Sequence, residues 1–134
     1  MLDVLRELKT ALENAGNENV YYAFDTIPVS AKGKMLTIIG AKSFEAMTPV
    51  YSEFLIYMPF KTELEISAAA PENCSMTQLY TYFESCIRPA LDALSGLSGR
   101  VCRMSIKHDS AMHRLVLTAG FSAAGIRRIE RSST

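Results

Sequence analysis

The sequence has no tryptophan, only two histidines and no net charge, because 14 basic residues balance 14 acidic residues over 134 positions. Proteins that bind nucleic acid or an anionic membrane surface usually carry an excess of basic residues. The balance therefore predicts no direct binding of nucleic acid and no membrane partner. The one local cluster of arginines, Arg127, Arg128 and Arg131, is expected to be a solvated tail.

Long apolar runs are also missing. No stretch approaches the ~20 apolar residues that a membrane-spanning helix needs. The N-terminus carries Asp3 and has no uninterrupted apolar segment of the kind found in secretory signals. These absences predict a soluble, intracellular protein.

Cysteine is scarce, and its spacing does not match that of a metal or disulfide site. Cys74, Cys86 and Cys102 are odd in number and form no C-x-x-C pair, which argues against a disulfide framework or a zinc knuckle. We expect free thiols that are buried or half-buried, with no metal site and no cofactor.

The composition that remains is ordinary for a globular protein, with 49 % hydrophobic and 21 % charged residues. A length of 134 residues is near the commonest size of one domain. We therefore expect residues 1–134 to form a single domain.

The strongest pattern is an alternation of apolar and polar side chains over residues 53–68, which is the period of a β-strand. A strand of these sixteen residues would reach roughly 50 Å, whereas a compact chain of this length has a diameter of about 36 Å. The strand must therefore bend sharply or project beyond its own domain. Pro59 cannot donate a backbone hydrogen bond, which predicts an edge position or a bulge.

Two amphipathic helices are expected. Apolar residues three and four positions apart predict a helix over residues 4–15, ended by Gly16 in a left-handed cap. Ser75 and Gln78 have the spacing of a capping box and begin a helix that runs to about residue 94. Pro89 is expected to kink or interrupt this second helix.

The other strands are predicted at residues 20–24, 35–45, 102–107 and 115–121. Residues 35–45 and 53–63 form a plausible hairpin, which leaves residues 64–70 to find another partner, either strand 20–24 or another chain. The fold predicted is α+β: a mainly antiparallel sheet of about five strands that includes a long hairpin, with two helices packed on one face.

The closest approach to an active site is formed by Cys102, His108 and His113. A catalytic thiol needs a base within hydrogen-bond reach, but two residues six positions apart on one strand lie roughly 20 Å apart. The spacing of the two histidines is not a recognised metal-binding spacing. We predict no enzyme activity and no catalytic residue, and an enzyme would require Cys102 and His108 to converge in a cleft.

The odd positions of the long strand differ between its two halves. Leu55 and Tyr57 in the first half are apolar, whereas Lys61, Glu63 and Glu65 in the second half are charged. Leu55 and Tyr57 would be covered either by a helix of the same chain or by a neighbouring subunit. The residues alone leave both alternatives open.

In the order of its elements, the chain resembles the phage tail terminator (tail completion) family. The residues that carry the resemblance to prophage tail proteins of Gram-positive bacteria are 34–45, 48–52, 59–66 and 125–132. The resemblance implies a non-enzymatic protein that forms a ring, in hexameric form, on the end of the tail tube and joins it to the head. It also implies contacts with other tail or head-completion proteins, and residence in the host cytoplasm and then in the virion tail.

Ring contacts in proteins of this kind come from sheet edges and loops. The subunit interface is therefore predicted at Met47, Pro49, Tyr51, Leu55, Tyr57 and Pro59. The alternative function is a small α+β binding or regulatory domain that docks a peptide or a ligand. An apolar pocket between the second helix and the sheet would favour that alternative.

Overall fold

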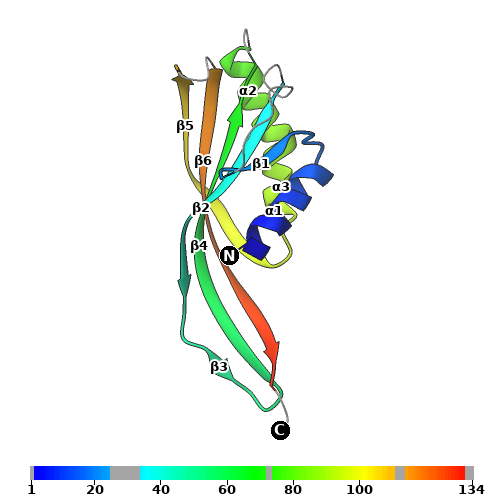
Figure 1. The fold of residues 1–134 in the computed structure, drawn as a ribbon, viewed down its shortest axis with the longest axis vertical. Helices are drawn as coiled ribbons and strands as arrows, with labels where there is room; N and C mark the ends of the chain where they lie inside the picture. Colours follow the sequence, from blue (N-terminus) through cyan, green and yellow to red (C-terminus); the bar gives the residue numbers. More distant parts are fainter. Residues whose placement is uncertain (1, 25–33, 72–73, 111–113, 132–134) are drawn as a thin grey trace.

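In the part of the chain that the structure describes, a mixed sheet of six strands runs through the length of the molecule, and helices accompany only its upper part (Figure 1). The computed structural model describes residues 2–24, 34–71, 74–110 and 114–131. The predicted α+β class is confirmed. The sheet is not purely antiparallel, because its first strand runs parallel to its neighbour.

The strands follow one another across the sheet in the order β1-β2-β4-β6-β5, and the short β3 pairs with β4 outside this path. All pairings except that of β1 with β2 are antiparallel. The strands are β1 (Val20–Tyr22), β2 (Leu36–Ala46), β3 (Val50–Tyr51), β4 (Leu55–Ala69), β5 (Leu97–Asp109) and β6 (Arg114–Glu130).

The long alternating stretch forms β4, which lies between β2 and β6. β6 pairs with the whole length of β4, whereas β2 pairs only with residues 60–69. At its other end β4 is joined by β3, which pairs with Ile56 and Tyr57. The predicted long strand is confirmed, and its first half projects below the helices (Figure 1).

The predicted register of the first hairpin is wrong. Within these two segments only residues 43–45 pair with residues 61–63, because the connection between β2 and β4 contains β3 and is not a tight turn. Residues 64–69 pair with β2 and β6 instead of with strand 20–24 or another chain. Strand β1 pairs with the beginning of β2.

Pro59 lies in β4 without a bulge, since the pairing with β6 continues through Ile126. Its carbonyl accepts a hydrogen bond from the N–H of Met47 at an N···O distance of 2.9 Å, just beyond Ala46, the last paired residue of β2. The N–H and C=O of a strand residue point to the same side, so Pro59 lacks its N–H where β2 has already ended. The pairing continues without the predicted bulge, and β4 is an interior strand of the sheet, so Pro59 is tolerated because its missing donor falls just beyond the end of β2.

Strand β6 is longer than predicted. Residues 126–130, expected in the solvated tail, pair with the first residues of β4. Gly125 does not interrupt the strand but lies opposite Phe60, and a Cβ atom on Gly125 would be 2.6 Å from Cζ of the Phe60 ring. The glycine therefore lets this ring pack across β6.

The helices are α1 (Leu2–Asn14), α2 (Met76–Tyr82) and α3 (Arg88–Asp92), with the π-helical segment η2 (Phe83–Ile87) between the last two. The capping box of Ser75 and Gln78 is present, and Gly16 ends α1 with a φ of 103°. The N–H of Arg88 donates to the carbonyl of Phe83, five residues earlier, so the predicted interruption next to Pro89 is confirmed. No helix within the described residues is long and apolar enough to cross a membrane.

The core lies between the helices and the upper half of the sheet. The even positions of β4 from Phe60 to Ala68 are buried, as the alternation predicts. Leu8 and Leu12 of α1 and Phe83 of η2 belong to the same apolar cluster as these strand residues. Burial of each large side chain of this kind contributes about 1.5–3 kcal/mol, so the core stabilises the upper part of the molecule.

A buried polar cluster joins α1, η2 and β2. Asn17 donates from Nδ2 to the carbonyl oxygens of Leu12 (2.8 Å) and Cys86 (2.7 Å). Its Oδ1 accepts hydrogen bonds from Oγ1 of Thr37 at 2.9 Å and from the hydroxyl of Tyr82. Burial raises the pKa of Tyr82 above its usual value. Asn17 thus donates a hydrogen bond to the carbonyl of Cys86 in the π-helical segment, where the regular α-helical pattern of backbone hydrogen bonds is interrupted.

Candidate functional site

The residues that the sequence offers for catalysis do not form a site. Cys102 is exposed in β5, with its Sγ 3.3 Å from the carbonyl oxygen of Gly120, and His108 is exposed near the end of the same strand. His113 lies outside the described residues. Within the described part of the chain, no group of three His, Cys, Asp or Glu side chains is placed to hold a metal ion.

All three thiols are free. Cys74 and Cys86 are half-buried, as predicted, but Cys102 is exposed because it is the extra residue of a bulge in β5, between Val101 and Arg103. A bulged residue is left out of the alternation of the strand. The prediction that every thiol is buried or half-buried is therefore wrong for Cys102.

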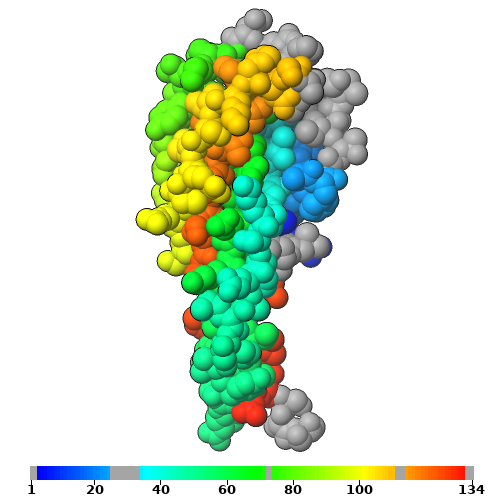
Figure 2. All heavy atoms as spheres, turned by 90° about the vertical axis from the view of Figure 1, so that its left-hand side faces the viewer, coloured from blue at the N-terminus to red at the C-terminus, as the bar shows by residue number. Residues whose placement is uncertain are grey.

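The feature that distinguishes the molecule is the projection below the helices, here called the arm and defined as residues 42–61 and 122–131. Figure 2 shows it as a narrow extension made of the end of β2, β3, the beginning of β4 and the end of β6. Ten large apolar side chains of the described residues are exposed, and seven belong to the arm. These seven are Phe44, Met47, Val50, Tyr51, Phe54, Ile126 and Ile129.

The strand register assigns the arm residues to two faces, because directly opposed residues of an antiparallel pair point to the same side. The core-side face continues the face that packs against the helices in the upper part. It carries Phe44, Ala46, Tyr51, Ile56, Met58, Phe60, Gly125, Arg127 and Ile129. The outer face carries Glu45, Val50, Leu55, Tyr57, Pro59, Lys61, Ile126, Arg128 and Glu130.

Ring contacts agree with this assignment. The rings of Phe44 and Phe60 stack with their centroids 5.1 Å apart, and the guanidinium carbon of Arg127 lies 5.9 Å from the Phe44 centroid. On the outer face, the guanidinium carbon of Arg128 lies 6.0 Å from the centroid of the Tyr57 ring. The two faces are thus chemically distinct, since the core-side face has no acidic residue and the outer face mixes both charges with apolar side chains.

The core-side face loses its cover where the helices end. In the upper part the same face is buried under α1, α2 and α3 (Figure 1). On the arm Tyr51 is 65 % exposed, Ile129 is 47 % exposed and Phe44 is 37 % exposed. A contiguous apolar surface rimmed by charged residues is typical of an interaction site.

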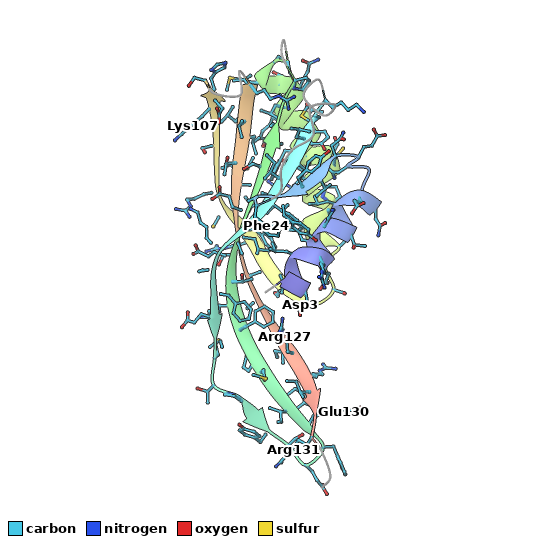
Figure 3. All side chains as sticks on the ribbon, viewed as in Figure 1. Asp3, Phe24, Lys107, Arg127, Glu130 and Arg131 are labelled. Carbon is cyan, nitrogen blue, oxygen red and sulfur yellow. The ribbon has the colours of Figure 1, made fainter. Side chains whose placement is uncertain are left out.

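The three arginines near the C-terminus are engaged and do not form the solvated tail that was predicted. Arg127 forms an ion pair with Asp3 at the beginning of α1, where the arm meets the helices (Figure 3). The guanidinium carbon of Arg131 lies 5.8 Å from the centroid of the Tyr51 ring. These contacts attach the end of β6 to α1 and to the tip of the arm.

The tip of the arm is held by hydrogen bonds. The N–H of Leu55 donates to Oγ of Ser52 at 3.0 Å, which closes the turn before β4. The backbone N–H of Arg131 donates to the carbonyl of Phe54, and its Nη1 donates to the carbonyl of Ser52, each at 2.8 Å. The exposed apolar side chains therefore lie on an ordered scaffold.

The six predicted interface residues all belong to the arm, but they are divided between its faces. Met47 is exposed, and Tyr51 is exposed on the core-side face. Leu55, Tyr57 and Pro59 are half-buried on the outer face, and Pro49 is also half-buried. Their role as an interface stays a prediction.

The prediction that a helix of the same chain covers Leu55 and Tyr57 is wrong. Helix α1 reaches only the upper end of the arm, at Arg127, and no described helix lies beside the beginning of β4 (Figure 1). Sequence reasoning missed the largest exposed residues around them, Phe44, Phe54, Ile126 and Ile129. The alternation of apolar and charged residues at positions 126–131 was the available signal for the last two.

Two shallow grooves offer less apolar surface than the arm. One lies between α1 and the turn after α3, and its lining includes Arg6, Glu7 and Asn14. The other lies on the outer face of the upper sheet, where Nζ of Lys42 is 3.5 Å from a carboxylate oxygen of Glu65. Neither is the apolar pocket between the second helix and the sheet that would favour ligand docking.

No protein-family model matches the chain. A search of curated proteins also found no significant match. We therefore base the function proposed below on the geometry of the arm and on the resemblance noted in the sequence.

Proposed function

We propose that the protein is a non-enzymatic assembly protein of a phage or prophage tail. In this role it is a tail terminator that forms a ring at the end of the tail tube and connects the tube to the head. The order of helices and strands that carries the resemblance supports this role. The partners are other copies of the chain and neighbouring tail or head-completion proteins, first in the host cytoplasm and then in the virion tail.

One observation carries the proposal: the arm exposes the apolar core-side face that the helices cover elsewhere. Seven exposed large apolar side chains on one projection are costly to leave in water, and burial of such side chains is the main driving force of association. Contact with another subunit removes this surface from water. The arm thus supplies a subunit interface without any catalytic group.

The core-side face is the favoured contact surface. Its only charged residue in the paired strands is Arg127, which is already matched by Asp3. Burial of the outer face would bring Glu45, Lys61, Arg128 and Glu130 out of water at a cost in desolvation. Tyr51, from the predicted interface, belongs to the favoured surface, and Met47 lies beside it in the connection to β3.

The alternative, a small binding or regulatory domain that docks a peptide or a ligand, has weaker support because both grooves contain charged residues and are shallow. An enzyme based on Cys102 and His108 has the least support, since six positions along one strand separate these groups by roughly 20 Å.

The test is the molar mass of the full-length protein in solution, measured by light scattering over a series of protein concentrations and at several salt concentrations. We expect mass to rise with concentration toward a closed ring, with the hexamer as the form that the resemblance implies. A strict monomer at high concentration, in every salt condition, would contradict the proposal.

A further inference from the structure

The edge of the sheet that β5 forms has no partner strand among the residues that the structure describes. β5 is the last strand in the order of the sheet and pairs on one side with β6. Figure 1 shows no described element beside its other side. The backbone N–H and C=O groups along an open edge can pair with a further strand. Such an edge is the binding site in proteins that bind an extended segment by adding it to a sheet.

A bulge at Cys102 divides this edge into two parts. From Arg103 to Asp109 the pairing of β5 with β6 continues without a shift in register. A bulge disrupts the ladder locally, whereas a regular strand presents an uninterrupted row of backbone groups. Residues 103–109 are therefore the part of the edge that fits another strand.

The side chains of residues 103–109 alternate between two environments. Met104 and Ile106 lie opposite buried residues of β6 and are half-buried against the apolar core. Arg103 and Lys107 are exposed on the outer face, and Figure 3 shows Lys107 on the side of the sheet away from the helices. A strand added beside β5 continues this alternation, so its side chains lie in turn beside apolar residues and beside cations.

The cations of β5 lack an acidic partner. Arg100, Arg103 and Lys107 form no ion pair with any residue that the structure describes. Arg103 lines a shallow groove together with Glu65, but the carboxylate of Glu65 lies 3.5 Å from Nζ of Lys42. Cations without a counter-charge in their own chain favour a partner that brings carboxylates.

A second copy of β5 is a poor occupant of this edge. When two copies of β5 pair in antiparallel fashion about Ser105, Arg103 of each copy lies opposite Lys107 of the other. Like charges directly opposite each other are destabilising. The one acidic residue of β5, Asp109, lies at the end of the strand, opposite Arg114 of β6. The edge thus disfavours pairing with itself.

We propose that residues 103–109 bind an extended segment of a different protein, in which acidic side chains alternate with apolar side chains. The backbone of the segment pairs with the open edge of β5. Its acidic residues lie beside Arg103 and Lys107, and its apolar residues lie beside Met104 and Ile106. This inference goes beyond the assembly function, because a single copy of the chain is sufficient for it. A nucleic acid is the less suitable partner, since it would leave the backbone edge and the apolar residues unused.

The test uses the full-length protein and two synthetic peptides of about nine residues, the length of an ordinary strand. In the first peptide aspartate alternates with valine, and in the second lysine replaces aspartate. Fluorescence anisotropy measures binding, and mass spectrometry measures amide hydrogen exchange in residues 97–109. We expect the aspartate peptide to bind and to slow exchange in this segment, because newly paired amides are protected. The lysine peptide should not bind.

A variant with Arg103→Gln and Lys107→Gln removes the two cations from the regular part of the edge. Both side chains are exposed, so circular dichroism should show an unchanged fold. The variant should bind the aspartate peptide about fivefold more weakly or worse, as expected when two opposite-charge pairs between strands are lost. The control, Arg6→Gln with Lys61→Gln, removes two exposed cations outside β5 and should bind within about twofold of the wild type, because distant charges are screened by salt.

Several results would overturn this inference. The aspartate peptide fails to bind, or the two variants bind it equally well. Binding without slower exchange in residues 97–109 would show that the peptide does not add as a strand. Exchange in this segment that slows with protein concentration alone would assign the edge to a second copy.

An oligothymidine is the probe for nucleic acid. If it binds more tightly than the aspartate peptide and is weakened by Arg103→Gln with Lys107→Gln, the cations serve nucleic acid and the inference is wrong. A protein that binds the aspartate peptide as expected but is a strict monomer would contradict the assembly function alone. A protein that self-associates but does not bind the peptide would contradict this inference alone.

Discussion

Asn17 is a polar side chain of the core that has hydrogen-bond partners in several elements. It is buried, and both of its amide donor bonds and its carbonyl oxygen are used by Leu12, Cys86, Thr37 and Tyr82. These partners belong to different elements, so a single side chain fixes α1 and the π-helical segment relative to β2. In the sequence, Asn17 is indistinguishable from an ordinary turn residue after a helix.

Replacement of Asn17 by alanine should lower the free energy of unfolding by about 3 kcal/mol, because a buried carbonyl and a buried hydroxyl lose their partner. Urea unfolding measures the change. Asn14→Ala, an exposed position at the end of α1, should change stability by no more than about 0.5 kcal/mol. Equal effects of the two substitutions would show that the buried cluster has no special role.

Tyr82 gives this cluster a dependence on pH. Burial raises the pKa of the folded-state phenol, so the folded protein keeps the proton above pH 10, where the unfolded chain loses it. Its contribution to stability is complete below the unfolded pKa and is lost as pH rises toward the folded pKa. Unfolding measured between pH 9 and 11 should therefore show a steeper loss of stability for the wild type than for Tyr82→Phe. Parallel curves would contradict this.

At the scale of elements, the pairing of β4 with β6 builds the arm and depends on a close contact at Gly125. The Phe60 ring packs across the strand there, and a Cβ atom would also be 2.7 Å from the carbonyl oxygen of Gly96. Gly120 lies in the same strand, but a Cβ atom there would be at least 3.6 Å from its neighbours. The two glycines thus form a matched pair with different surroundings.

Gly125→Ala should lower the free energy of unfolding by about 1–3 kcal/mol, the usual cost of overpacking. Gly120→Ala should be neutral or stabilise the protein by up to about 1 kcal/mol, because alanine reduces the conformational freedom of the unfolded chain. Thermal and urea unfolding of both variants provide the measurement. If Gly125→Ala is as stable as Gly120→Ala, the ring of Phe60 does not need the glycine.

Most elements could be predicted from the sequence because their signals are local. The alternation at residues 53–68, the capping box at Ser75 and the position of Pro89 depend on neighbouring residues. The register of β2 with β4 could not be predicted, because it depends on the pairing of Val50 and Tyr51 with β4. The parallel pairing of β1 has no local signal either, since its partner in β2 lies across a long connection.

The candidate site was only partly predictable for a related reason. Proximity in sequence to the long strand identified Tyr51 and Met47, but Ile126 and Ile129 reach the arm through the pairing of β6 with β4. The apolar character of Leu55 and Tyr57 pointed to the outer face. The more uniformly apolar core-side face is recognised only when the register shows where the helices end.

At the scale of the whole molecule, one sheet serves two purposes. Its upper half forms a core with the helices of the same chain, and its lower half presents the same face without a cover. The length of β4 and β6, which exceeds what a compact body needs, is explained if the extra length binds a second subunit. The central claim is therefore that the core-side face of the arm drives self-association.

Ile129 and Ile126 test this claim most directly, because they lie three residues apart in β6, are both exposed and point to opposite faces of the arm. The measurement is the dissociation constant for self-association, determined by sedimentation equilibrium for Ile129→Asp and Ile126→Asp. Ile129→Asp should raise this constant at least about tenfold, and Ile126→Asp should change it by less than about threefold. Equal effects, or a larger effect of Ile126→Asp, would contradict the account.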